Sequence, residues 1–198
     1  MRSATVLLAA ALVIVFLCEV ALGVAGSETM LLPLGALRTR GWSVTDWWRI
    51  LTFSFLHLNA LHLTLNTIAL YWLGGIVERR VGARGMLAIF AGGGLTSGVA
   101  AMLLGPLLPT TGIAVGASGA VFGLLAAAAL LVFRSDAAEP YRDRRLRVAL
   151  TTCLVVGTVI SFLPGVSLAG HLGGLLGGLL IVRTRRITGA AVPPTSSR

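Results

Sequence analysis

The feature that most constrains this chain is a series of long apolar runs separated by short polar segments. Several of these runs approach the ~20 residues that an α-helix needs to cross the hydrocarbon core of a bilayer. Hydrophobic residues make up 56% of the chain and charged residues only 12%, whereas soluble domains carry roughly 25% charged residues. The sequence therefore predicts an all-α integral membrane protein. We expect six transmembrane spans, at residues 4–25, 50–77, 86–105, 118–133, 148–163 and 167–182.

These spans form a single predicted domain, residues 1–187, followed by a tail at 188–198 that we expect to be disordered because it is rich in Pro, Ser and Thr. The first run admits two interpretations, a retained helix or a cleaved signal peptide that starts at Arg2. We favour a retained helix, because the run of about 20 residues exceeds the roughly 7–15 residues of a signal-peptide core. Glu19 is then expected at the membrane interface, near the far end of this helix.

The formal net charge of +9 comes from arginine, because all 16 basic residues are Arg. Most of them lie just outside the apolar runs, where they orient a membrane protein. Aromatic residues are not interleaved with them, as they are in nucleic-acid-binding patches, so we expect no nucleic-acid partner. With six spans, every arginine except Arg38, Arg40 and Arg49 falls on one side. Positive charge is enriched on the cytoplasmic side, and the sequence therefore predicts that both termini are cytoplasmic.

Five polar residues interrupt the apolar runs at one predicted depth. In this topology the second, fourth and sixth spans run inward from the outer face. Ser118 opens the fourth span and His171 lies near the start of the sixth. The first half or middle of the second span carries His57, His62 and Asn66. All five are therefore expected in the outer half of the membrane.

Ser118 and His171 form a pair that can carry out nucleophilic chemistry. A serine hydroxyl becomes a good nucleophile when a neighbouring base accepts its proton, and histidine, with an ordinary pKa near ~6.5, can do so at neutral pH. Asn66 and His62 lie four residues apart on one helical face. Both can donate hydrogen bonds to a developing oxyanion. Phe122, one turn after Ser118, is placed to pack against the imidazole ring.

Small residues surround this predicted site. They cluster at the start of the fourth span and recur every four residues in the sixth, at Gly116, Gly119, Gly123, Gly170, Gly174 and Gly178. Such residues let helix backbones approach closely in lipid. We expect this approach to bring Ser118 to His171.

In order and spacing, these residues resemble the motifs of the rhomboid family of intramembrane serine proteases. Each motif is weak alone, but together they are specific, and they cover residues 42–182. The matching patterns are G-x-S-G from Gly116 to Gly119, H-x4-H-x3-N at His57, His62 and Asn66, H-x2-G-x3-G at His171, Gly174 and Gly178, the pair Trp48 and Arg49, and E-x3-G at Glu78 and Gly82.

The resemblance implies a six-transmembrane-helix bundle of the rhomboid type and a Ser118–His171 dyad with no third carboxylate. It also implies an oxyanion site made by the Ser118 backbone amide, His62 and Asn66. No metal or other cofactor is expected. Supporting roles fall to the remaining motif residues, which are Gly116, Gly119, Phe122 and His57.

The same resemblance implies substrates that are single-pass transmembrane proteins, cut near the outer membrane face at small residues in a segment that unwinds easily. It implies a mobile fifth span that gates lateral entry from the lipid bilayer, and we expect the protein in the inner membrane of a bacterium. Two positions depart from the family pattern. Gly170 stands where Ala often precedes the histidine, and Phe122 where Tyr often stands, but neither change removes a group that the mechanism needs.

A non-catalytic, pseudoprotease-like membrane protein that binds client helices is the main alternative. His57 is as compatible with a structural role as with a functional one. Zinc binding is disfavoured because His57 and His62 are five residues apart rather than the four of a helical zinc pair, and a transporter is disfavoured because the chain lacks inverted repeats. The sequence does not determine the physiological substrate or the oligomeric state.

Overall fold

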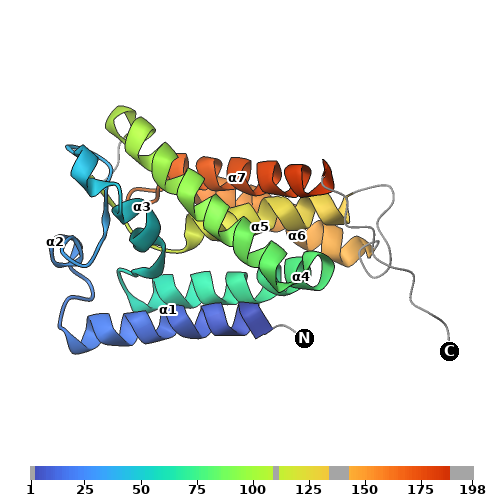
Figure 1. Ribbon diagram of the computed structural model, residues 1–198, viewed down its shortest axis with the longest axis horizontal. Coiled ribbons are helices and arrows are strands. Elements are labelled where there is room, and N and C mark those ends of the chain that lie inside the picture. Colours follow the sequence, from blue (N-terminus) through green and yellow to red (C-terminus); the bar gives the residue numbers. More distant parts are fainter. Residues whose placement is uncertain (1–2, 109–111, 134–142, 188–198) are drawn as a thin grey trace.

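The computed structural model describes residues 3–108, 112–133 and 143–187, with only the backbone for 185–187, and most of these residues are helical (Figure 1). The long helices are α1 (Ser3–Ala21), α4 (Ala60–Leu104), α5 (Ser118–Val132), α6 (Arg144–Ile160) and α7 (Leu168–Ile187). Short helical turns are α2 (Glu28–Leu31), η1 (Val44–Asp46), α3 (Arg49–Thr52), η2 (Phe53–Phe55) and η3 (Gly105–Leu107). Two short strands, β1 (Leu37–Arg38) and β2 (Ile113–Ala114), pair antiparallel. The predicted tail at 188–198 lies outside the described residues.

α4 consists of two helical arms that meet at a kink. As one rod its 45 residues would extend about 68 Å at ~1.5 Å per residue, about twice the ~30 Å of a bilayer core. The helix breaks at Gly82, whose φ of 75° and ψ of 170° cost little only for glycine. The arms before and after Gly82 overlap the predicted second and third spans, and the chain reverses between them (Figure 1).

The prediction for the start of the second span is wrong. Residues 50–59 form the end of α3, η2 and an extended segment, and the helix begins only at Ala60. Asn59 caps this helix, because its side-chain oxygen accepts a hydrogen bond from the His62 amide at 2.9 Å. The apolar residues of 50–59 look like a continuation of the span in the sequence, but they pack in the connection. His57 therefore lies before α4 and not on it.

Two buried carboxylates fix the ends of α1, one to the connection before α4 and the other to α4 itself. Glu19, expected at the membrane interface, is only 1% exposed, and its carboxylate accepts hydrogen bonds from the His57 backbone amide at 3.2 and 3.3 Å. At the other end of α1, Glu78 accepts bonds from the backbone amides of Ala4 and Thr5 at 3.1 and 2.9 Å and from the Thr5 hydroxyl at 2.6 Å. These bonds offset the cost of burying the two carboxylates.

α5 lies at the centre of the bundle, and most of its residues are buried against α4 and α7. α7 approaches it at glycine positions. A Cβ atom on Gly174 would lie 2.0 Å from the Gly119 carbonyl oxygen, and one on Gly178 would lie 2.1 Å from the Gly123 carbonyl oxygen. The second arm of α4 also packs closely on α5, because a Cβ on Gly93 would lie 3.1 Å from the Gly123 Cα atom. The backbones of the helices are therefore in direct contact, as the small residues predict.

Arg49 holds the long connection between α1 and α4 together at the end of the molecule away from the termini (Figure 1). Its guanidinium group donates hydrogen bonds to the carbonyl oxygens of Leu32 and Ala36, and its Nε lies 2.7 Å from an Asp46 carboxylate oxygen. The Ser43 backbone amide and the Arg49 guanidinium hold the pKa of the Asp46 carboxyl below its ordinary value. This connection is therefore an ordered, hydrogen-bonded structure.

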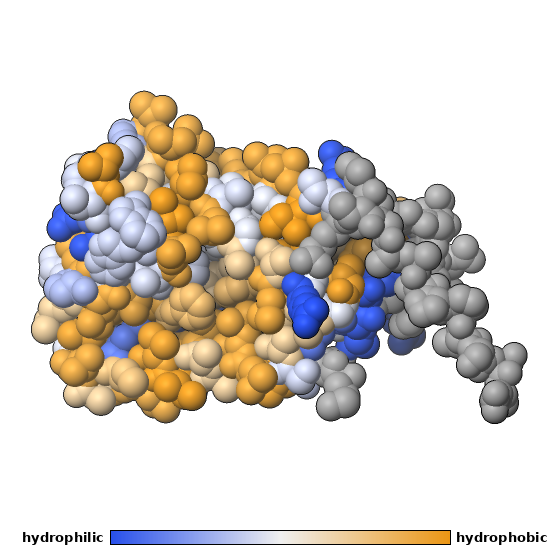
Figure 2. Space-filling model, in the orientation of Figure 1, coloured by the Kyte–Doolittle hydropathy of each residue, from blue (hydrophilic) through white to orange (hydrophobic). Residues whose placement is uncertain are grey.

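Two stretches of the described residues have the length and apolar character of a membrane span. α1 and the stretch Ala60–Leu107 are long and apolar enough to cross a membrane, and Ser118–Val132 and Leu168–Thr184 are shorter apolar helices. On the face shown in Figure 2, apolar residues cover most of the middle, and hydrophilic residues lie mainly toward the two ends. The predicted helical class is confirmed.

We expect Gly178→Ala to destabilise the protein. The added methyl group would collide with the Gly123 carbonyl oxygen, so α7 has to move away from α5. Overpacking of this kind costs about 1–3 kcal/mol, which lowers the unfolding temperature of a chain of this size by roughly 2–10 °C. Thermal unfolding in detergent measures this change. Leu176→Val is the control, because Leu176 is 56% exposed on the same helix; equal unfolding temperatures for Gly178→Ala and the unmutated protein would contradict the contact.

Candidate active site

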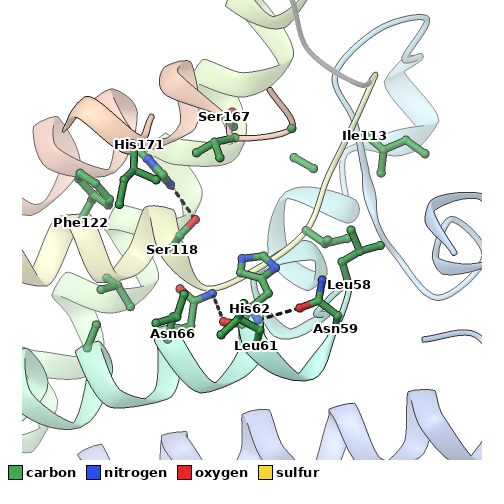
Figure 3. A pocket seen from close by; sticks show the side chains of 18 of the residues that line it. Leu58, Asn59, Leu61, His62, Asn66, Ile113, Ser118, Phe122, Ser167 and His171 are labelled. Atoms are coloured by element: carbon green, nitrogen blue, oxygen red, sulfur yellow. Dashed lines mark hydrogen bonds between the residues drawn. The ribbon is translucent and has the colours of Figure 1, made fainter. Parts of the chain in front are cut away.

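A pocket of about 440 Å³ opens beside the first residue of α5 (Figure 3). Its walls come from α4, α5, α6 and α7 and from the connections that precede α5 and α7. Five of the predicted site residues line it together: His62, Asn66, Ser118, Phe122 and His171. The fold thus gathers in one cavity side chains that are more than 100 residues apart in the sequence.

The side chains of Ser118 and His171 are hydrogen-bonded. His171 Nε2 lies 2.9 Å from Ser118 Oγ, the distance of a normal hydrogen bond (Figure 3). Ser118 is the first residue of α5 and His171 lies in the first turn of α7, so both project from the same end of two helices in contact. A hydroxyl and an imidazole in this arrangement can act as nucleophile and general base.

Two further contacts fix the His171 ring. Phe122 stacks on it, with ring centroids 4.1 Å apart and planes 11° from parallel. On its other edge, His171 Nδ1 lies 2.6 Å from Ser161 Oγ, at the end of α6. The sequence does not predict this role for Ser161, because a single serine near the end of an apolar run carries no motif.

Gly116 allows the first turn of α4 to approach the segment that leads into Ser118. Its φ of 113° lies in the region that favours glycine. A Cβ atom here would lie 2.5 Å from Cε1 and 2.6 Å from Nε2 of His62, and 3.6 Å from Nδ2 of Asn66. The Gly116 amide donates a hydrogen bond to the Phe53 carbonyl oxygen at 2.9 Å, which holds the segment in place.

Several hydrogen-bond donors lie in the same pocket as Ser118. Asn66 Nδ2 donates one hydrogen to the His62 carbonyl oxygen at 3.0 Å, and its second hydrogen remains for another acceptor. The backbone amide of Ser118 lies in the first turn of α5, where amides have no acceptor within the helix. Together with the His62 imidazole, these groups can stabilise a negative charge that develops on a bound carbonyl oxygen.

The remaining predicted residues lie behind the pocket. The His57 and His62 rings meet edge to face with centroids 5.2 Å apart, and His57 is fully buried. Gly119 packs against Ser97, since a Cβ atom on Gly119 would lie 1.9 Å from Ser97 Oγ. Within the part of the chain that the structure describes, no three His, Cys, Asp or Glu side chains gather in a way that could hold a metal ion.

A family model, the Rhomboid domain, matches residues 44–187. The chain belongs to the rhomboid family. It is 32% identical to Rhomboid protease GluP of Bacillus subtilis (strain 168) over 164 residues, which cover 82% of this chain and 31% of that protein. It is 31% identical to Rhomboid-like protease 3 of Toxoplasma gondii over 159 residues, which cover 79% of this chain and 58% of the relative. Rhomboid protease AarA of Providencia stuartii is 33% identical over 158 residues, which cover 69% of this chain and 55% of that protein.

The comparisons confirm the resemblance to rhomboids that the motifs indicate. As a member of this family, the chain is an integral membrane protein. The matched region covers 31% to 58% of the length of these three relatives.

We expect Gly116→Ala to impair the reactivity of Ser118 in this rhomboid. The methyl group would overlap the His62 imidazole and push it out of the pocket. The rate at which a fluorophosphonate probe labels Ser118 should fall at least ~10-fold, because a displaced donor no longer stabilises the oxyanion that forms during labelling.

Gly112→Ala is the matched control for this prediction. Gly112 also has a positive φ, of 87°, but a Cβ atom there would meet no atom within 4 Å. The control therefore introduces backbone strain without a collision, and its labelling rate should stay close to that of the unmutated protein. Equal labelling of Gly116→Ala and Gly112→Ala would show that the approach of His62 to Gly116 does not matter.

Proposed function

We propose that this protein is an intramembrane serine endopeptidase in which Ser118 is the nucleophile and His171 the general base. The observation that carries the proposal is the 2.9 Å hydrogen bond between the two side chains inside a pocket. The family supports it, because relatives that match most of this chain are named rhomboid proteases. Asn66, His62 and the Ser118 backbone amide form the proposed oxyanion site, while Gly116, Gly119, Phe122 and His57 support it.

In the proposed reaction, Ser118 Oγ attacks the carbonyl carbon of the scissile peptide bond while His171 Nε2 accepts the hydroxyl proton. The resulting oxyanion is stabilised by the donors beside Gly116. His171 then donates the proton to the leaving amine, which leaves an acyl group on Ser118. A water molecule attacks this ester with His171 again as base, and the Ser118 hydroxyl is restored.

The proposed membrane arrangement has six spans: α1, the two arms of α4, α5, α6 and α7. At ~1.5 Å per residue, the 15 residues of α5 extend about 22 Å, which is less than the ~30 Å of a bilayer core. Because α5 ends near the cytoplasmic surface in this arrangement, a helix of this length begins inside the membrane, so Ser118 lies recessed below the outer face. The arginines near Gly82 and at the start of α6 favour the cytoplasm for both termini, and we place the protein in the inner membrane of a bacterium.

Single-pass transmembrane proteins are the proposed substrates, cut at small residues near the outer face. Leu61 and Leu65 of α4 line the pocket, yet they are 68% and 60% exposed. Across the pocket, Ile160 at the end of α6 also lines the cavity and is exposed. Apolar side chains on the outer surface of a membrane protein face lipid, so the pocket communicates with the bilayer between α4 and α6. A substrate helix can enter by this route.

We expect Ser118→Ala and His171→Asn each to reduce cleavage of a model transmembrane substrate by at least ~10³-fold, because each removes one half of the nucleophile–base pair. Gel analysis of the purified protein in detergent measures the cleavage. Thr64→Ala, which removes an exposed hydroxyl from the first arm of α4, should cleave normally. Persistent cleavage by Ser118→Ala would refute the proposal, and substrate binding without fluorophosphonate labelling would favour a non-catalytic binder.

Asn66→Ala tests the proposed oxyanion site separately. We expect kcat to fall about 10²-fold with little change in KM, because the lost donor acts mainly on charge that develops in the transition state. Steady-state kinetics with a fluorogenic transmembrane peptide distinguishes the two parameters. A rise in KM at constant kcat would instead assign Asn66 to substrate binding.

A further inference from the structure

Ser161 connects the catalytic pair to α6 through two short hydrogen bonds. Its Oγ lies 2.6 Å from His171 Nδ1 and 2.6 Å from the carbonyl oxygen of Gly157, one turn earlier in its own helix. The residue is only 2% exposed, so water does not compete freely for these contacts. The proposed function above assigns no role to Ser161.

The number of hydrogens decides the direction of both bonds. A carbonyl oxygen only accepts, and a serine hydroxyl carries one hydrogen, so the Ser161 hydrogen points to Gly157. This bond to the carbonyl four residues back is a common one for serine in helices. Ser161 Oγ then receives the hydrogen of His171 Nδ1. The imidazole therefore carries its proton on Nδ1, and Nε2 keeps a free lone pair.

The free lone pair is what the proposed reaction needs. With Nδ1 protonated, Nε2 accepts a hydrogen bond from the Ser118 hydroxyl and can take its proton. The opposite tautomer would place a hydrogen on Nε2, which would then donate to Ser118 Oγ and could not act as a base. The tautomer of His171 thus decides whether the pair is competent.

We propose that Ser161 is a positioning residue that holds His171 in the tautomer with its proton on Nδ1, an inference that rests on the proposed function. The bond also strengthens when His171 accepts the proton of Ser118, because hydrogen bonds from a charged donor are stronger than neutral ones. Ser161 is thus a neutral acceptor at the histidine edge where other serine proteases carry an aspartate. A neutral group suits this place, since a buried charge is costly in a membrane.

The ¹⁵N NMR spectrum of the unmutated protein tests the tautomer directly. The chain has only three histidines, so His171 can be assigned from the signals lost in His171→Asn. At a pH where His171 is neutral, we expect a protonated Nδ1 and an unprotonated Nε2. The reverse pattern would overturn the inference, and this measurement does not depend on how any Ser161 variant folds.

Ser161→Ala tests the consequence for catalysis. We expect kcat to fall about 10-fold or more at constant KM, since a hydrogen bond to a charged group is lost. The ¹⁵N signals of His171 should shift toward a mixture of tautomers. Ser161→Thr keeps a hydroxyl that can make both bonds and should restore kcat. Thr152→Ala, which removes an exposed hydroxyl from the same helix, should have normal kcat.

These experiments separate this inference from the proposed function. Unchanged kcat and unchanged ¹⁵N signals in Ser161→Ala, with Ser118→Ala inactive, would refute the role of Ser161 alone. Cleavage by Ser118→Ala would refute the protease mechanism, whatever the tautomer of His171. If Ser161→Ala has a lowered unfolding temperature, the kcat of Ser161→Thr and the ¹⁵N spectrum of the unmutated protein decide whether Ser161 positions His171.

Discussion

The direct contact between the backbones of α5 and α7 determines whether Ser118 and His171 can meet in one site. Ser118 and His171 each lie in the first turn of one of these helices, so the separation of the helices sets the distance between their side chains. Lipid provides no hydrophobic force that would press two apolar helices together, and association depends on close packing. Glycines at the crossing let the carbonyl oxygens of α5 lie where a Cβ atom of α7 would otherwise be. One added methyl group at this crossing would separate the helices enough to weaken the Ser118–His171 bond.

A second constraint comes from irregular backbone. The connection between α1 and α4 contains turns and extended segments whose amides and carbonyls find no partner in a regular helix. Buried or half-buried charged side chains satisfy several of them: Glu19 accepts from the His57 amide, and Arg49 donates to two carbonyl oxygens. Non-helical backbone is tolerated near a membrane only where the protein itself supplies such partners. These charged groups therefore hold the connection between α1 and α4 in place. This connection contains His57 and the Phe53 carbonyl oxygen that accepts the hydrogen bond of the Gly116 amide.

The sequence predicts the helices and the proximity of Ser118 and His171 well, but not the contacts that depend on the whole fold. The helices at the predicted later spans begin and end within about five residues of the predicted bounds, because prolines, glycines and arginines interrupt the apolar runs near their ends. The start of α4 was misplaced, since apolar residues in a packed connection look like those in a helix. Glu19 was assigned to the interface because its partner, the His57 amide, lies 38 residues away. Ser161 could not be found because its bond to His171 depends on the turn between α6 and α7.

The place of Ser161 on α6 limits how this helix can move. In the proposed entry route, substrate passes between α4 and α6. Most of α6 is exposed, and Leu150 is the only buried residue of this described helix. The end of the helix is held more firmly, because a Cβ atom on Gly157 would lie 2.8 Å from the Phe122 ring and Ser161 bonds to His171. A movement of the whole helix would break the Nδ1 bond and with it the proposed control of the His171 tautomer. An opening compatible with catalysis must therefore bend α6 before Gly157, or the end of α6 must return before the reaction begins.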